Sequence, residues 1–268
     1  MIANILAIAG SDPSGGAGIQ ADIKAISANG AYAMAAITAL TAQNTQGVSG
    51  VHMVPPEFVA AQIRALRADI RIDAVKIGML GTAPVITAVT DALTGLAAPV
   101  VLDPVMVAKS GDRLLDAAAI DALRGLLPRA ALLTPNLPEA ADLLGADEAR
   151  TPDAMLEQAQ ALLALGPQAV LLKGGHLPGG DCRDLLMQDS GALWLPGLRH
   201  PTRNTHGTGC TLSSTLAALI GQGHALPEAA ARAKAYVAGA IAAADALCVG
   251  QGHGPTHHFH RLFQGAPA

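Results

Sequence analysis

Aromatic side chains are scarce in this chain of 268 residues, which has two tyrosines, three phenylalanines and one tryptophan. An aromatic ligand would therefore be held mainly by aliphatic, methionine and amide groups rather than by ring stacking. Only three cysteines occur, Cys182, Cys210 and Cys248, an odd number without metal-type spacing. Such sparse cysteines argue against a disulfide framework and a zinc cluster.

Long apolar runs and basic runs are also missing. No stretch of 18 or more apolar residues is present, so no membrane-spanning helix is expected. Residues 1–8 are apolar but lack a basic segment, and Asp12 follows closely, which favours a first β-strand over a signal peptide. With 17 Lys and Arg against 21 Asp and Glu, and no mixing of basic with aromatic residues, nucleic acid is not an expected partner. We expect a cytoplasmic protein.

Apolar strand patterns and helical patterns alternate along the chain. The runs that read as buried parallel strands are 5–9, 35–40, 74–77, 100–102, 131–133 and 169–172. Helical patterns fall at 18–27, 57–69, 84–95, 117–127, 138–144, 153–165, 208–221 and 227–247. This alternation predicts a three-layer α/β/α domain with a mostly parallel central sheet. Segments 184–188 and 192–195 predict an antiparallel hairpin at its edge, and no linker divides residues 1–268, so one domain is expected.

Polar side chains follow most of the predicted strands. Because the carboxyl ends of parallel strands share one edge of a sheet, where open α/β sheets bind ligands, these residues are candidates for one site. Strand ends are also where polar loops begin in any α/β protein. The residues concerned are Asp12, Gln43, Asn44, Lys76 to Met79, Asp103, Asn136 and Lys173.

The segment from Asn204 to Leu212 combines a glycine turn with the start of a helix. Gly207 and Gly209 allow backbone N–H groups to converge, and the helix N-terminus favours negative charge, so phosphate is the expected ligand. The same field should favour the thiolate of Cys210, as a proton acceptor or nucleophile. The alternative is a turn with an inert, buried cysteine.

A carboxylate lies on the apolar stripe of the first helix. Asp22 shares that stripe with Ile19 and Ile26, and an unpaired buried carboxylate is costly, so Asp22 should have a partner. A bound ligand with N–H groups, a backbone amide and Lys76 are the alternatives. The loop before this helix is neither a Walker A motif nor a dinucleotide fingerprint.

Asn136 and Glu139 lie three residues apart where a strand gives way to a helix. Oxygen ligands of this kind suit Mg²⁺ beside substrate phosphates, with Asp103 as a second carboxylate. A helix start with a favourable acid in its first turn is the alternative. Lys173 either lies near nucleotide phosphates or only ends a strand, and the loop 109–112 either closes over a ligand or is a surface turn.

Several of these motifs together resemble the hydroxymethylpyrimidine/phosphomethylpyrimidine kinase family of thiamine biosynthesis. The resemblance covers nearly the whole chain and implies a ribokinase-like fold, ATP with Mg²⁺ and a homodimer. It also implies two successive phosphorylations, of 4-amino-5-hydroxymethyl-2-methylpyrimidine and then of its monophosphate. The motifs that carry it are residues 9–22, 38–45, 76–80, 134–140 and 204–210.

Each site residue takes a role from this resemblance. Cys210 becomes the base, and Gly207, Thr208 and Gly209 become the anion hole for the transferred phosphoryl group. The pyrimidine pocket is assigned to Gly10, Asp22, Gln43, Met79, Val105 and Val107. Nucleotide and phosphates are assigned to Lys173, Asn136, Glu139 and Thr205, with Asp103 and Glu139 as metal ligands.

Three other functions remain open at this point. Pyridoxal or pyridoxine kinase activity is one, because a pyridine alcohol resembles the pyrimidine alcohol in size and in its CH₂OH group. A non-catalytic nucleotide- or vitamin-binding regulator of the same fold is another. A dinucleotide-dependent oxidoreductase is disfavoured because the chain lacks the Gly-x-Gly-x-x-Gly fingerprint.

Overall fold

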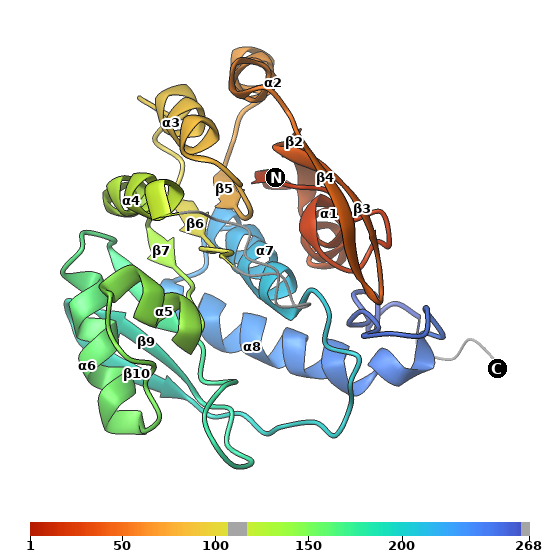
Figure 1. Ribbon diagram of the computed structural model, residues 1–268, viewed down its shortest axis with the longest axis vertical. Coiled ribbons are helices and arrows are strands. Elements are labelled where there is room, and N and C mark those ends of the chain that lie inside the picture. Colours follow the sequence, from red (N-terminus) through yellow and green to blue (C-terminus); the bar gives the residue numbers. More distant parts are fainter. Residues whose placement is uncertain (107–116, 264–268) are drawn as a thin grey trace.

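The computed structural model describes residues 1–106 and 117–263, and its centre is a twisted β-sheet (Figure 1). Within these residues the sheet has eight strands in the order β10-β9-β8-β7-β6-β5-β1-β2. All neighbours from β2 to β8 are parallel, whereas β9 and β10 are antiparallel. The strands are β1 (Asn4–Ala9), β2 (Tyr32–Ile37), β5 (Ala74–Ile77), β6 (Val100–Leu102), β7 (Leu132–Leu133), β8 (Ala169–Leu172), β9 (Asp184–Gln188) and β10 (Gly191–Leu195). The predicted mostly parallel sheet and its edge hairpin are confirmed.

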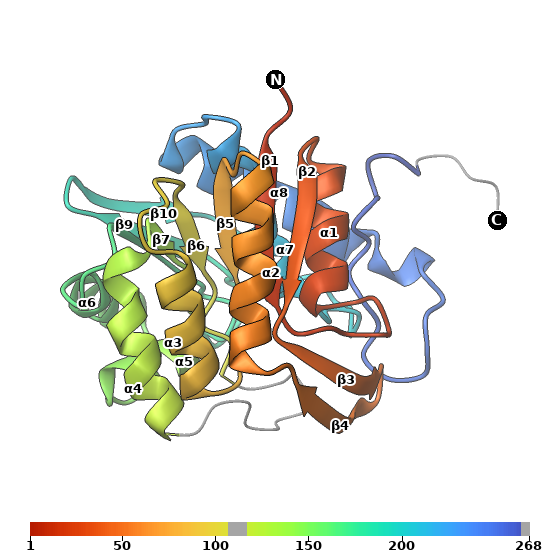
Figure 2. The same ribbon diagram turned by 90° about the horizontal axis from the view of Figure 1, so that it is seen from above.

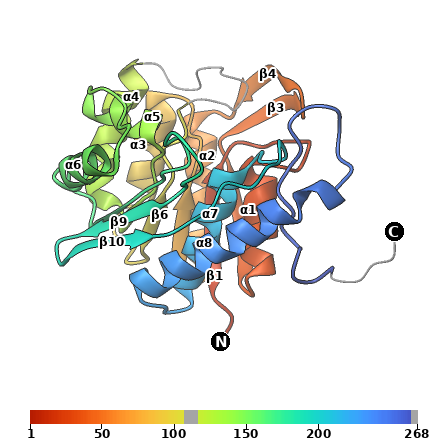
Figure 3. The same ribbon diagram turned by 90° about the horizontal axis from the view of Figure 1, so that it is seen from below.

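Helices cover both faces of the sheet and give two separate cores. One face, in front in Figure 2, packs against α2 (Pro56–Asp69), α3 (Ala83–Ala92), α4 (Ala117–Leu126), α5 (Leu137–Leu144) and α6 (Pro152–Leu163). The other face, in front in Figure 3, packs against α1 (Gly18–Ala28), α7 (Thr208–Gly221) and α8 (Leu226–Ala242). Short 3₁₀ turns follow α4 at Leu127–Arg129 and α8 at Ala244–Ala246. The three-layer α/β/α architecture is therefore confirmed.

The distribution of buried residues explains why the central elements form. Strand β1 is buried over five of its six residues, as expected for a parallel strand covered on both faces. Helix α7 lies between α1 and α8 and is buried on most of its circumference, including Ser213, Ser214 and Thr215. These hydroxyls are satisfied by hydrogen bonds, because burying an unpaired polar group is costly.

A second, two-stranded sheet stands beyond the carboxyl ends of the main strands. It consists of β3 (Ala39–Asn44) and β4 (Gly47–Met53), which pair antiparallel with a bulge between Ala42 and Gln43. Figure 2 shows this hairpin projecting from the end of β2. The predicted strand 35–40 is thus wrong in extent, because it joins the end of β2 to the start of β3. Gln43 and Asn44 lie within β3 rather than after a strand of the main sheet.

Among the described residues, no helix is long and apolar enough to cross a membrane.

Candidate active site

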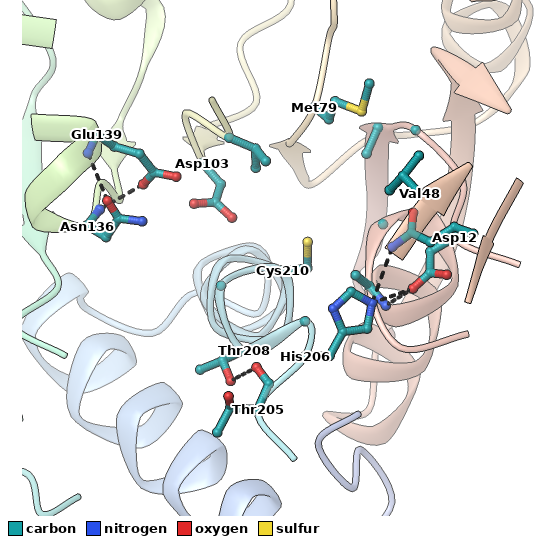
Figure 4. A pocket seen from close by; sticks show the side chains of 18 of the residues that line it. Asp12, Val48, Met79, Asp103, Asn136, Glu139, Thr205, His206, Thr208 and Cys210 are labelled. Carbon is teal, nitrogen blue, oxygen red and sulfur yellow. Dashed lines mark hydrogen bonds and ion pairs between the residues drawn. The ribbon is translucent and has the colours of Figure 1, made fainter. Parts of the chain in front are cut away.

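A pocket of about 700 Å³ opens at the carboxyl ends of the parallel strands. Loops after β1, β5, β6 and β8, the β3–β4 hairpin and the N-terminus of α7 form its walls (Figure 4). Most of the residues predicted from sequence meet here. Those that line the pocket are Gly10, Gln43, Met79, Asp103, Val105, Asn136, Glu139, Lys173, Thr205, Gly207, Thr208, Gly209 and Cys210. Val107 and the loop 109–112 lie outside the described residues.

The glycine turn begins α7 as predicted. Gly207 is the N-cap residue, with φ of 76° in the left-handed region, and its carbonyl accepts a hydrogen bond from Thr211 N at 2.8 Å. The hydroxyl of Thr208 donates to the carbonyl of Thr205 at 2.7 Å. Because the first turn of a helix has N–H groups without helical acceptors, this end of α7 offers donors to an anion in the pocket.

The turn also packs directly against the β1–α1 loop. A Cβ atom on Gly207 would lie 1.8 Å from the carbonyl oxygen of Gly16, so no side chain fits there. Two glycine-containing loops that are far apart in sequence therefore meet backbone to backbone at the pocket floor. This contact explains why glycine is required at position 207 beyond its positive φ.

We expect Gly207→Ala to lower both stability and activity. Overlap with the Gly16 carbonyl adds to the strain of alanine at positive φ, for a total of about 1–3 kcal/mol. Gly95→Ala is the matched control, since Gly95 has φ of 74° but a Cβ atom added there would meet nothing within 4 Å. Thermal unfolding of both variants measures the difference, and an equal loss in the two would contradict the contact argument.

Cys210 lies on the first turn of α7, with its sulfur directed to the middle of the pocket (Figure 4). Burial raises the pKa of its thiol to about 11, although Lys76 pulls this pKa downward. Burial therefore opposes the thiolate that the helix N-terminus is expected to favour. Desolvation penalises the charged form more than the nearby positive charges favour it.

Asp22 does not line the pocket, which corrects its assignment as a pyrimidine-binding residue. Its side chain is fully buried, and both carboxylate oxygens accept from Lys76 Nζ, at 2.8 and 2.9 Å. Ser214 Oγ donates a third hydrogen bond at 2.7 Å. Of the alternatives left open by the sequence, Lys76 is thus the partner. Burial alone would lower the pKa of Lys76, but Asp22, Cys210 and Asp103 together raise it, so the ammonium stays charged.

Asp103, Glu139 and Lys173 form a second charged group at the opposite end of the pocket. Lys173 Nζ lies 3.0 Å from Asp103 Oδ1 and 3.8 Å from Glu139 Oε2. Asn136 and Glu139 form a reciprocal capping box at the start of α5, with both hydrogen bonds at 2.8 Å. Burial and the neighbouring Asp103 raise the pKa of Glu139 to about 7, while Lys173 opposes them.

The raised pKa of Glu139 has a measurable effect on stability. Between its ordinary value of 4.5 and about 7, the folded protein binds more protons at Glu139 than the unfolded chain. The contribution of Glu139 to the free energy of unfolding is therefore greatest below pH 4.5 and falls as the pH rises to 7. We expect Glu139→Gln to exceed wild type in free energy of unfolding at pH 8, by at most roughly 3 kcal/mol. Denaturant titrations at pH 5 and 8 check this, and a difference that does not grow with pH would contradict it.

Comparison with known proteins shows the family to which this chain belongs. The sequence model of the family described as phosphomethylpyrimidine kinase matches residues 12–257. The chain belongs to this family. Hydroxymethylpyrimidine/phosphomethylpyrimidine kinase of Salmonella typhimurium is 54% identical over 96% of this chain and 97% of that protein.

Solved structures place the phosphomethylpyrimidine kinase fold among vitamin kinases. The phosphomethylpyrimidine kinase of Clostridium difficile superposes with a TM-score of 0.79 at 40% identity, covering 89% of this chain and 99% of that one. Pyridoxal kinase of Bacillus subtilis, in complex with ADP, gives a TM-score of 0.88 at 35% identity, covering 96% and 98%. The predicted family and the ribokinase-like fold are confirmed.

Sequence reasoning gave Asp12 as a candidate but missed His206 and the contact between the two. His206 Nε2 lies 2.8 Å from Asp12 Oδ2 and 3.5 Å from Gln43 Nε2. Burial opposes the ionisation of Asp12, but hydrogen bonds from His206, Ser14 and Ala17 lower its pKa below the ordinary value. The available signals were Asp12 in the loop after β1 and a histidine beside the glycine turn, yet a sequence separation of 194 concealed the contact.

Proposed function

We propose that this chain transfers the γ-phosphoryl group of ATP to 4-amino-5-hydroxymethyl-2-methylpyrimidine and then to the resulting monophosphate, in thiamine biosynthesis. Family membership supports the reaction, and one observation supports its location in this pocket. Cys210 and the Gly207–Gly209 turn lie between a half lined by Gln43 and Met79 and a half lined by Lys173 and Glu139. An acceptor and a nucleotide can therefore meet at the turn within one continuous cavity.

The half of the pocket near β1 and the β3–β4 hairpin suits a small aminopyrimidine. Gln43 offers an amide that can pair with the amino-pyrimidine edge, while Met79 and Val105 supply apolar contact. A Cβ atom on Gly10 would lie 3.1 Å from the sulfur of Met79, so a larger residue at position 10 would require Met79 to shift. We assign the pyrimidine to Gly10, Gln43, Met79 and Val105, and keep Val107 as a proposal from the family resemblance.

The first transfer needs a base, and we assign that role to Cys210. As the hydroxymethyl oxygen attacks the γ-phosphorus, its proton passes to Cys210 in its thiolate form, and the bond from the γ-phosphorus to the bridging oxygen of ADP breaks. Backbone N–H groups of the Gly207–Gly209 turn stabilise the charge on the transferred group. Lys76 favours the thiolate electrostatically from beneath the pocket floor.

The other half suits the nucleotide phosphates, with Lys173, Asn136, Glu139 and Thr205 beside them. For Mg²⁺ we propose Asp103 and Glu139. No group of three or more His, Cys, Asp or Glu among residues 1–106 and 117–263 could hold a metal ion by itself. Two carboxylates that already share Lys173 fit a cation bound mainly by water and phosphates, which is the usual arrangement for Mg²⁺ with ATP. Bound there, the ion would neutralise charge on the phosphates.

Phosphorus NMR of the purified protein with Mg·ATP and the pyrimidine alcohol tests the proposed function. We expect a monophosphate signal followed by a diphosphate signal. A monophosphate alone would favour a broader alcohol kinase. Tight binding without turnover would favour a non-catalytic regulator.

Pyridoxal kinase activity is the second candidate, because the pyridoxal kinase of Bacillus subtilis shares the fold across almost the whole chain. Comparing kcat/KM for pyridoxal and the pyrimidine alcohol decides between the two substrates. A larger value for pyridoxal would replace our first assignment.

We also propose that the chain is a single kinase domain, acts as a homodimer in the cytoplasm and binds neither nucleic acid nor membranes. The dimer rests on the family resemblance alone. Light scattering coupled to size-exclusion chromatography measures it directly, and a mass near the 27.0 kDa of one chain would contradict it.

A further inference from the structure

The two proposed acceptors differ in charge, although they share one pocket. The first is a neutral alcohol, whereas a phosphate monoester carries about −1.5 to −2 charges near neutral pH. The turn at Gly207–Gly209 is common to both steps, so the attacking oxygen must occupy the same place in each. In the second step, the phosphate of the acceptor must therefore lie beside this turn.

Few basic side chains are available to meet that phosphate. Among the described residues that line the pocket, the basic ones are Lys173, His176 and His206. Lys173 is paired with Asp103 and Glu139, and His176 follows β8 in the nucleotide half. His206 directly precedes the turn and lies next to Gln43, in the acceptor half.

Asp12 fixes which ring nitrogen of His206 faces the acceptor. The carboxylate of Asp12 is 1% exposed and already accepts from Ser14 N and Ala17 N, so it holds Nε2–H of His206 at 2.8 Å. Both side-chain contacts of His206, with Asp12 and Gln43, are made through Nε2. Figure 4 shows the ring with Nε2 toward Asp12 and its other nitrogen on the side of α7.

The backbone of His206 is held as firmly as its ring. Its N–H donates to the carbonyl of Gly254 at 3.0 Å, and its carbonyl accepts from Thr256 N at 3.3 Å. A Cβ on Gly16 would lie 2.6 Å from the ring carbon Cδ2, so the ring fits only because position 16 is glycine. A side chain held in place in this way can bind a ligand without a further loss of conformational freedom.

This inference rests on the proposed function. We infer that His206 binds the phosphate of the second acceptor as an imidazolium, with Nε2–H on Asp12 and Nδ1–H donating to a phosphate oxygen, and thereby enables the second phosphorylation. In this complex the ring lies between the acceptor phosphate and the carboxylate of Asp12, which would otherwise repel each other. In this step an oxygen of the acceptor phosphate forms the new bond to the γ-phosphorus, and the bond to the bridging oxygen of ADP breaks. His206 transfers no proton.

Two substitutions at position 206 separate the functions of the ring nitrogens. Glutamine can keep a contact with Asp12 where Nε2 lies but loses the cation and Nδ1, whereas asparagine can place a donor where Nδ1 lies. We expect His206→Gln to lower kcat/KM for the monophosphate about 10–100-fold more than kcat/KM for the alcohol, mostly through KM. His206→Asn should recover part of this loss.

The experiment measures each step separately with Mg·ATP, for wild type, both variants and His52→Gln. His52 is exposed on β4 and does not line the pocket, so its substitution should change neither step. Equal losses in both steps for the two His206 variants, with thermal unfolding as a folding check, would show a structural role and overturn the inference. An unaffected second step would also overturn it. Wild-type protein that phosphorylates neither pyrimidine would remove the proposed function and this inference together.

Discussion

Cys210→Ala is expected to slow phosphorylation of the pyrimidine alcohol by about 10²–10⁴-fold, the usual contribution of a general base. Phosphorylation of the monophosphate should slow far less, because the attacking phosphate oxygen is already an anion. The two steps therefore separate a base from a structural residue within one active site. Loss of a cysteine with only a packing role would affect both steps alike.

The pH dependence of the first step follows from the same residue. With a thiol pKa of about 11, Cys210 is mostly protonated at neutral pH, and its thiolate fraction grows as the pH rises. We expect kcat/KM for the alcohol to rise across the range from pH 7 to 9 in wild type. This slope should be absent in Cys210→Ala and absent from the second step.

Steady-state rates for each acceptor, measured separately, check both expectations. Cys248→Ala is the matched control, since Cys248 is an exposed cysteine that does not line the pocket. Equal losses in both steps for Cys210→Ala would assign Cys210 to the anion-binding turn instead of proton transfer.

The local part of this site could be predicted from sequence. Helix α7 spans Thr208–Gly221, the range predicted from the spacing of Leu212, Leu216 and Leu219 after the glycine turn. Glycine requirements and helix periodicity are properties of neighbouring residues, so they are visible in one segment. The same holds for the helix start at Asn136 and Glu139, which was the alternative to a Mg²⁺ site there, although the reciprocal capping box was not predicted.

The β3–β4 hairpin was missed because large apolar residues of its strands are exposed while a small one is buried, the reverse of the usual strand pattern. Leu40 is 49% exposed and Val51 is 47% exposed, while the small residue Ala39 faces inward. Its strands pair with each other and not with the main sheet, so no continuous apolar run marks them. Sequence alternation identifies strands best when their apolar side chains are buried.

The sequence indicated that a buried charged residue needs a partner, but not which distant residue that partner is. The position of Asp22 on an apolar stripe required a partner, yet Lys76 lies 54 residues away and Ser214 192 residues away. The direction of the pKa shift at Cys210 could not be predicted either. The helix N-terminus, a local feature, favours a thiolate, whereas burial by distant segments opposes it. Only the assembled fold determines which effect is larger.

Lys76→Met is expected to destabilise the protein by about 3–5 kcal/mol, a larger loss than the one expected for Gly207→Ala. It leaves the Asp22 carboxylate fully buried with Ser214 as its remaining side-chain partner. Denaturant unfolding measures the change. Arg71→Met is the matched control, because it breaks the exposed ion pair with Asp73 and should hardly shift the unfolding midpoint.

Removing both charges should separate stability from catalysis. In the double variant Lys76→Met with Asp22→Leu, neither charge of the pair is left buried alone, and replacing a buried pair by apolar groups is often neutral or stabilising. We therefore expect much of the lost stability to return. The first phosphorylation should recover only in part, because Cys210 has lost the cation that lowers its pKa, and this effect is larger than that of the lost Asp22 carboxylate, which raises it. Full recovery of both would show that the pair only supports the fold. Recovery of stability without full recovery of the first phosphorylation would support control of the basicity of Cys210, the proposed base, by a buried lysine that does not line the pocket.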